Sequence, residues 1–522
     1  MTTTLYRKVS IASLIMIVSV FLSRVIGLAR EMVIASVGGV SGGVDAYLVA
    51  FIIPEILNHI VASGFLSVTF IPIFSRYLVE DREAEGWRVF SLILNGFGSL
   101  LILFTLAAWI FAPELVARLA PGIEDPKVLA MATRMTRIIM PAQFFFFAGG
   151  LFMAVQFAKE QFKVPALAPL IYNIGIIAGG ALLSPWLGME GFSWGVLAGA
   201  FVGNFWIQYL GARRAGMTIV PVFKLNHPDL KRYILLTLPL MLGLTMTFSA
   251  EIFLKFFGSY LPTGSIAALN FGFRIMFILV GLFGQAVGVA SFPFMARLVA
   301  ENRMDEMNRL LNQTLRYLAL VIPVSILFIV LRQEVVAILF ERGQFDAAAT
   351  DLTARVLLFL MGGAFAFAAQ TVVVRGFYAM QDTVFPAVFG TVAVALSIPL
   401  YWYGMALFGP GGVALAISLS AALQVALLYM VWNRRSQNKG SRSVYRFYLW
   451  MILFSIPLGL GLEWIKTIFR LWVAWDGFAG SLAVAILTGV VFTAVVLSAG
   501  YGLRVREVAD ILDKVIGKLK RG

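Results

Sequence analysis

Long apolar stretches alternate with short polar segments along the whole chain. Fourteen of these stretches reach about 20 residues, the length that an α-helix needs to cross a hydrocarbon core of roughly 30 Å. Helix is the only reasonable assignment, because the period-two alternation of a strand is absent and unpaired backbone groups are costly in lipid. The predicted spans are 10–37, 45–75, 89–112, 131–157, 164–185, 190–212, 233–257, 265–296, 313–331, 354–376, 384–407, 411–433, 446–465 and 477–503.

Composition agrees with a membrane chain. Hydrophobic residues make up 60% of the sequence and the mean hydropathy is +0.89, so a soluble domain would leave large apolar patches in water. The first stretch is long, carries Arg24 and Arg30, and lacks a small-residue cleavage site, so we expect it to remain in the mature protein rather than to be a signal peptide. No loop is long enough to fold by itself.

The basic residues predict the orientation. The two termini and the even-numbered loops carry 28 of them, against 9 in the odd-numbered loops, and short basic loops stay in the cytoplasm. Both ends should therefore face the cytoplasm. The net charge of +14 is then mostly a topology signal, and no nucleic-acid partner is predicted.

Cysteine and histidine usage limits the possible chemistry. The chain has no cysteine and only two histidines, His59 and His227, which excludes disulfides, thiolate metal sites and a cysteine nucleophile. We therefore expect no metal, haem or other cofactor.

The two halves of the chain match at a constant offset of 221 residues. Pro72 corresponds to Pro293, Arg76 to Arg297, and the pair Arg213-Arg214 to Arg434-Arg435. Matches at one offset in separate segments indicate a duplicated unit, and in a membrane chain such a duplication points first to a transporter with two facing halves.

The repeat and the spans together predict an all-α polytopic membrane protein. The offset carries span 1 onto span 7, an even shift, so the two six-helix repeats should be parallel, with two further helices after them. The predicted divisions are an N-terminal bundle at 1–220, a C-terminal bundle at 221–440, two extra helices at 441–505 and a basic cytoplasmic tail at 506–522. A cavity, if present, should lie between 1–220 and 228–440.

Charged and polar residues inside the spans are the candidates for function. A charge near the bilayer centre costs about 2.5 to 3.5 kcal/mol on insertion scales, so such residues usually face a wet cavity or a partner. Span 1 carries Arg24 and Arg30, and span 8 carries Arg274. Span 2 begins at Asp45 and then places a polar stripe on one helix face. The stripe consists of Glu55, Asn58, His59 and Ser63.

Each candidate also has a structural interpretation. The three arginines could snorkel or pair with buried acids, and His59 alone is more often a hydrogen-bonded interior histidine than a proton carrier. Guanidinium groups suit an anionic cargo such as a diphosphate, because they bind phosphate oxygens at two points at any pH. Acids in the spans roughly balance the bases, however, so composition alone does not fix the sign of the cargo.

Several motifs resemble the MurJ (MviN) lipid II flippases, members of the multidrug/oligosaccharidyl-lipid/polysaccharide exporter superfamily. The similarity starts in the segment from Ser23 to Glu31 (SRVIGLARE) and in the Asp45-Ala46-Tyr47 start of span 2. It continues in residues 341–347 (ERGQFDA) and in residues 377–383 (FYAMQDT). It extends over essentially the whole chain.

This resemblance implies an inward-open bundle that accepts an undecaprenyl-diphosphate-linked disaccharide-pentapeptide, lipid II, and releases it outside by alternating access. It implies cargo contacts at Arg24, Arg30, Arg274 and Asp45, and a groove for the polyprenyl tail in the last two helices. The implied partners are this glycolipid, the surrounding membrane lipids and proteins of cell-wall synthesis. A transporter of this kind is not an enzyme.

The sequence departs from the family pattern near the proposed headgroup site. Asn58 stands where the family usually has an arginine, Ser63 where an acid often follows, and Phe277 replaces an acid one turn after Arg274. An exporter of another polyprenyl-diphosphate-linked oligosaccharide, of O-antigen or exopolysaccharide type, therefore remains an alternative. A membrane-embedded glycosyltransferase or polymerase is a third, against which stands the lack of a large outer loop or a clustered acidic constellation.

Overall fold

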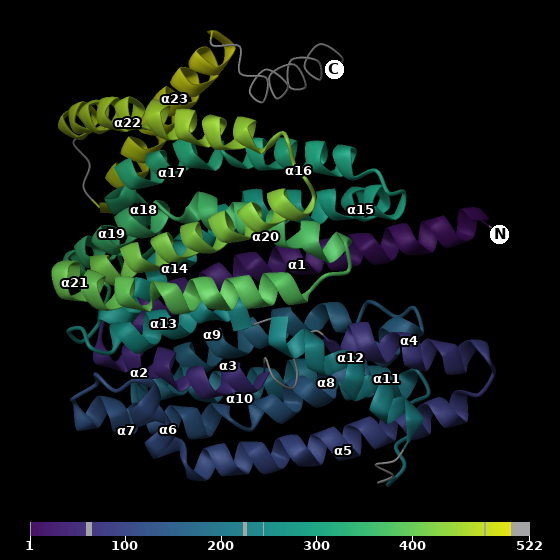
Figure 1. Ribbon diagram of the computed structural model, residues 1–522. Helices are drawn as coiled ribbons and strands as arrows, with labels where there is room; N and C mark the ends of the chain where they lie inside the picture. The colour runs from purple at the N-terminus through teal and green to yellow at the C-terminus, as the bar shows by residue number, and fades with distance from the viewer. Residues whose placement is uncertain (1, 59–64, 223–226, 244, 474–476, 503–522) are drawn as a thin grey trace. The chain divides into compact units, whose positions relative to one another are not determined.

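The computed structural model describes all residues except 1, 59–64, 223–226, 244, 474–476 and 503–522. The described chain is helical and contains no strand (Figure 1). Contacts group it into two compact units. Unit 1 comprises Met1–Ala267 with Arg342–Phe345, and unit 2 comprises Ala268–Glu341 with Asp346–Gly522.

Unit 1 contains the first thirteen α-helices and two short helical segments. A buried cluster rich in aromatic residues joins α4, α5 and α8, where Phe70, Phe90 and Phe152 are fully or almost fully buried. The elements are α1 (Thr2–Gly38), α2 (Gly42–Ala50), α3 (Ile52–Leu57), α4 (Phe65–Val79), α5 (Glu83–Ile110), α6 (Ala112–Leu119), α7 (Pro126–Ile139), α8 (Ala142–Ala158), η2 (Pro165–Leu167), α9 (Ala168–Leu187), α10 (Glu190–Gly199), η3 (Ala200–Trp206), α11 (Ile207–Arg214), α12 (Pro228–Gly243) and α13 (Thr245–Gly258).

Unit 2 contains the remaining helices, although the first residues of α14 belong to unit 1. Within it, α22 packs on α17 and α23 on α18, through buried apolar side chains such as Val330, Leu458 and Phe492 (Figure 1). The elements are α14 (Ser265–Val280), η4 (Gly281–Gln285), α15 (Ala286–Ala300), α16 (Met304–Leu318), α17 (Val321–Val330), α18 (Arg332–Phe340), α19 (Ala347–Met361), α20 (Ala364–Ala379), α21 (Val384–Arg435), α22 (Ser441–Trp472) and α23 (Gly477–Gly502).

Nine described helices are long and apolar enough to cross a membrane, and the bent pair α19 and α20 makes a tenth. α21 contains two of the predicted spans, 384–407 and 411–433, which meet at a kink at Gly409. The predicted spans 45–75, 190–212 and 233–257 are each built from shorter segments. The described helices are thus consistent with the predicted fourteen spans, although length and composition alone pick out fewer.

Turn geometry supports the internal repeat. Four pairs of residues 221 positions apart share a positive φ, a conformation that costs energy for any residue except glycine. The pairs are Asp81 and Asn302, Glu160 and Gln381, Gly188 and Gly409, and Gly216 and Gln437. The φ angles of Gly188 and Gly409 are 54° and 55°, so the helix reverses in the same way in both units.

Two helices contain π-helical turns, η3 and η4, in which the regular backbone hydrogen bonding shifts by one residue. In unit 2, η4 lies against α20, where the Thr371 hydroxyl donates to the Gly284 carbonyl at 2.9 Å. A neighbouring side chain therefore satisfies a carbonyl in the irregular turn.

Candidate functional site

The two arginines of α1 lie in different environments. Arg30 is part-buried in a seam between α1 and α9, where its Nη1 donates to Asn173 at 3.1 Å and its Nη2 to Glu31 at 2.5 Å. Arg24 is exposed. Six residues turn an α-helix by about 240°, so the two guanidinium groups leave α1 on different sides. The structure therefore gives Arg30 partners within unit 1 and places Arg24 on the surface of that unit.

Asp45 holds the beginning of α14 in unit 1. Its carboxylate accepts hydrogen bonds from the backbone N–H groups of Gly264, at 2.5 Å, and Ala267, at 2.8 Å. The side chain is buried, with 4% of the residue exposed. These bonds satisfy donors at a helix N-terminus, which is a typical capping role for an aspartate. Any contact of Asp45 with a cargo would have to share or replace them.

A cavity of about 620 Å³ opens beside Asp45 in unit 1. The segments before α7 and before α14 form its walls, and its lining includes Glu124, Asp125, Ser259 and Thr263. Ser259 fastens the two segments together, because its hydroxyl accepts from the Gly122 N–H at 3.1 Å. Acidic and hydroxyl groups, rather than bases, line this cavity.

The polar stripe of the second span is described only in part. Glu55 is paired with Lys255 of α13 at 2.6 Å, and Lys255 is almost fully buried. This pair joins two helices whose residues lie 200 positions apart, so the spacing of polar residues along one span does not predict it. Asn58 directly follows α3 and is partly exposed. His59 and Ser63 lie outside the described residues.

Arg274 is half-buried in α14 of unit 2. Phe277, one turn further on, packs against Phe273 and against Phe367 of α20, with ring centroids 4.6 and 5.4 Å apart. The aromatic ring at this position therefore joins two helices of the same unit. The residue one turn after Arg274 is thus an aromatic ring that packs between helices, and not an acid.

A further arginine inside the helices was missed by sequence reasoning. Arg375 is not among the candidates that the polar pattern of the spans picks out, but it lies within α20 and is partly buried. Its Nη1 donates to the Thr371 carbonyl at 3.3 Å. The signal was available, since the predicted span 354–376 already includes Arg375.

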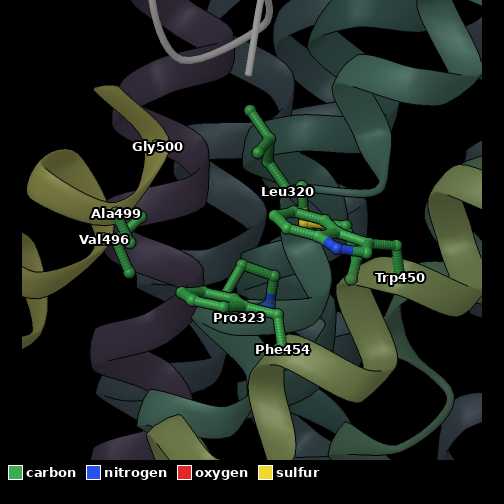
Figure 2. A pocket seen from close by; sticks show the side chains of 8 residues that line it. Leu320, Pro323, Trp450, Phe454, Val496, Ala499 and Gly500 are labelled. Atoms are coloured by element: carbon green, nitrogen blue, oxygen red, sulfur yellow. The ribbon is translucent and has the colours of Figure 1, made fainter. Parts of the chain in front are cut away.

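The last two helices contact the rest of unit 2 through hydrogen bonds and ion pairs in one region and through apolar side chains in another. Lys466 of α22 donates to the Val330 carbonyl and to Glu463, both at 2.7 Å, while Arg470 donates to the buried Glu334 at 2.6 Å. A small apolar pocket of about 10 Å³ lies nearer the start of α22 (Figure 2). Its lining includes Leu320, Pro323, Trp450 and Phe454. A pocket of this volume has room for about one water molecule.

The described ranges hold no group of three or more histidine, cysteine, aspartate or glutamate side chains that could bind a metal ion. What they do hold is a set of basic side chains inside apolar helices of a duplicated, all-helical chain. These features define a multi-pass membrane protein of the transporter class, because intramembrane charge usually marks a pathway for a polar cargo.

Comparisons identify the family. A model of the family described as lipid II flippase MurJ matches residues 34–500, and the chain belongs to this family. A lipid II flippase MurJ of Burkholderia cenocepacia is 27% identical over 85% of this chain and 87% of its own length. A probable lipid II flippase MurJ of Vibrio cholerae is 25% identical over 90% and 94%.

Solved structures agree on the fold. A lipid II flippase MurJ in an inward closed conformation aligns with a TM-score of 0.72 at 22% identity, over 93% of this chain and 99% of that one. A multidrug resistance transporter of the MATE family, in an inward-facing conformation, aligns with a TM-score of 0.61 at 14% identity, over 80% and 94%. The predicted fold class and the predicted family are both confirmed.

Proposed function

We propose that this chain translocates lipid II from the inner to the outer leaflet of the bacterial cytoplasmic membrane by alternating access. The main support is the family match, which runs from residue 34 to residue 500 and so includes Asp45, the second span and Arg274, while Arg24 and Arg30 lie just before its start. The activity is transport without a covalent step.

In this proposal the arginines of the helices hold the acidic groups of the cargo. Arg24 and Arg274 are the principal candidates, because Arg24 is exposed and Arg274 is only half-buried. Arg30 supports the binding surface from within the α1–α9 seam, and Asp45 shapes it through the start of α14. Glu55, Asn58, His59 and Ser63 are proposed to line the same path along the second span.

The arrangement of the chain in the membrane is part of the proposal. The bundles 1–220 and 221–440 would enclose the path, with both termini in the cytoplasm and the tail 506–522 at the inner surface. Helices α22 and α23 would guide the polyprenyl tail, since their outward faces are apolar, with Leu453, Leu460 and Val490 exposed. A tail of this kind is too long for a closed polar cavity, so it requires a route that is open to lipid.

A reconstituted leaflet-translocation assay tests the function. Purified protein in liposomes should move lipid II between leaflets, and depletion in a host without other flippases should trap lipid II in the inner leaflet. Normal surface exposure of lipid II after depletion would refute the proposal.

A second candidate is export of another polyprenyl-diphosphate-linked oligosaccharide. It is favoured by Asn58, Ser63 and Phe277, and Phe277 is committed to aromatic packing with α20. The same liposome assay separates the two candidates when lipid II is compared with other polyprenyl-diphosphate sugars. Turnover of a labelled lipid-linked sugar by the purified protein would instead support a transferase.

A further inference from the structure

In unit 2, α20 lies close against η4 and α15 along a line of small residues. A Cβ added to Gly284 would lie 2.7 Å from the Cα of Ala368. One turn further on, a Cβ added to Gly288 would lie only 1.8 Å from Nη1 of Arg375. The guanidinium group of Arg375 therefore occupies space on α15 that only glycine leaves open.

One hydrogen bond joins the Arg375 side chain to its own helix, and a second bond joins that helix to η4. Thr371 ties α20 to η4 through its bond to the Gly284 carbonyl, and the Thr371 carbonyl accepts from Arg375 Nη1 at 3.3 Å. Among the residues that the structure describes, no carboxylate lies within 4.0 Å of the Arg375 guanidinium. A guanidinium carries five N–H donors, so most of its capacity remains for an external acceptor.

The fold itself does not require an arginine here. The position 221 residues earlier is Ala154, which is fully buried, and the counterpart of Gly288 is Ser67. Two simpler roles for Arg375 are to keep the following loop in the cytoplasm and to extend its charge to the membrane surface. Neither role requires a glycine on the neighbouring helix. The combination of Arg375 with Gly288 is thus a feature of unit 2 alone.

We propose that Arg375 binds a phosphate oxygen of a lipid headgroup, and that this headgroup is the diphosphate of the transported glycolipid. The proposal rests on the proposed function and adds to it a contact in α20. Arg375 lies about one turn before the end of α20 at Ala379, on the predicted cytoplasmic side, where a lipid-linked cargo enters. A planar guanidinium held on one edge can present its other edge to an oxyanion in two-point fashion.

Two sources share this chemistry, the diphosphate of the cargo and the phosphate of an anionic phospholipid. The experiment uses the full-length protein in nanodiscs of neutral phosphatidylcholine. One arm measures the Kd for lipid II, and the other measures retained phosphatidylglycerol by native mass spectrometry. Arg375→Gln should raise the Kd for lipid II about tenfold, the effect of losing one hydrogen bond between charged groups. Arg375→Lys should fall between wild type and Arg375→Gln.

Gly288→Ala provides an independent variant, because it leaves the charge in place and displaces the guanidinium. It should weaken lipid II binding in the same direction as Arg375→Gln. Gly96→Ala in α5 is the matched glycine control, since nothing lies within 4 Å of the added Cβ, and Arg355→Gln is the arginine control on an exposed pair with Asp351. Both controls should bind lipid II like the wild type.

The outcomes separate the possibilities. If Arg375→Gln loses phosphatidylglycerol but keeps its affinity for lipid II, Arg375 binds a membrane phospholipid and the assignment to cargo is wrong. If neither affinity changes while the variant remains folded, Arg375 is structural and the proposal is overturned. Wild-type protein that neither binds nor moves lipid II would refute the proposed function, and the phosphatidylglycerol arm would still test the phosphate site.

Discussion

At the scale of single residues, the arginines inside the helices differ in their exposure and in the hydrogen bonds that they make within their own unit. Arg30 is fixed by Asn173 and Glu31, whereas Arg24 is exposed on the same helix. A side chain that its own unit does not bury can change partners during a transport cycle. The sequence pattern offers both Arg24 and Arg30 as candidates, and the contacts show how their surroundings differ.

Arg24→Ala and Arg274→Ala should each lower translocation of lipid II at least about tenfold, because each removes a charged hydrogen-bond donor from the cargo path. The liposome assay and complementation of a flippase-deficient host measure this loss. Membrane insertion, followed by the amount of folded protein after purification, should not change. Full activity in both variants would remove these residues from the mechanism, and Lys at either position should restore activity only in part.

Asp45 carries a different expectation, because its oxygens cap α14. Asp45→Ala should destabilise the protein by about 1 to 2 kcal/mol, the usual effect of losing a cap, and Asp45→Asn should cost less because its amide oxygen can still accept. Thermal unfolding of the purified variants measures the order. Equal stability of both variants and the wild type, with activity lost, would instead indicate direct contact with the cargo.

At the scale of helices and turns, the reversal at Gly409 depends on backbone freedom. Its φ of 55° and ψ of −131° lie in a region open essentially to glycine, and no atom lies within 4 Å of an added Cβ. Gly409→Ala should therefore cost about 1 to 3 kcal/mol from strain alone. Gly461→Ala, a helical position with equally free space, is the control and should not lower the unfolding temperature.

The contact between α4 and α12 predicts a response to acid. Tyr77 and Arg76 both donate to Asp229, at 2.5 and 2.9 Å. Burial of Asp229 alone would raise its pKa, but these hydrogen bonds outweigh burial and lower the pKa below the ordinary value of 3.8.

A group with a lowered pKa stabilises the folded state above its ordinary pKa, and this contribution is lost as the pH falls through the lowered value. The unfolding temperature should therefore show no change due to Asp229 between about pH 7 and pH 5, and a decrease below about pH 4. Asp229→Asn should flatten that decrease. An unchanged acid slope in the variant would show that the contact contributes nothing to stability.

Much of the helix pattern could be predicted because apolar length is a property of the sequence itself. The bonds between distant segments could not. The pair of Glu55 with Lys255 joins residues 200 positions apart, and the Gly288 space filled by Arg375 depends on how closely two helices approach. Arg375 lay within a predicted span, yet nothing in the linear pattern showed that a glycine on another helix would hold it.

At the scale of the whole molecule, the predicted orientation can be tested by thiol labelling. The chain contains no cysteine, so no native residue would react with the label. Glu124→Cys and Asp305→Cys place single thiols at exposed positions, the first before α7 and the second in the first turn of α16. In intact cells, a membrane-impermeant maleimide should label the first and not the second. The reverse pattern would invert the predicted topology.

The four matched turns also show that the two copies of the repeat have the same length. Between the first and the last pair, neither copy of the repeat has gained or lost a net residue relative to the other, although their side chains have diverged widely. Both copies must cross the same hydrocarbon thickness, and a helix rises only about 1.5 Å per residue. The thickness of the bilayer therefore sets the length of both copies. Shortening one copy by a few residues should be tolerated far less than exchanging its amino acids.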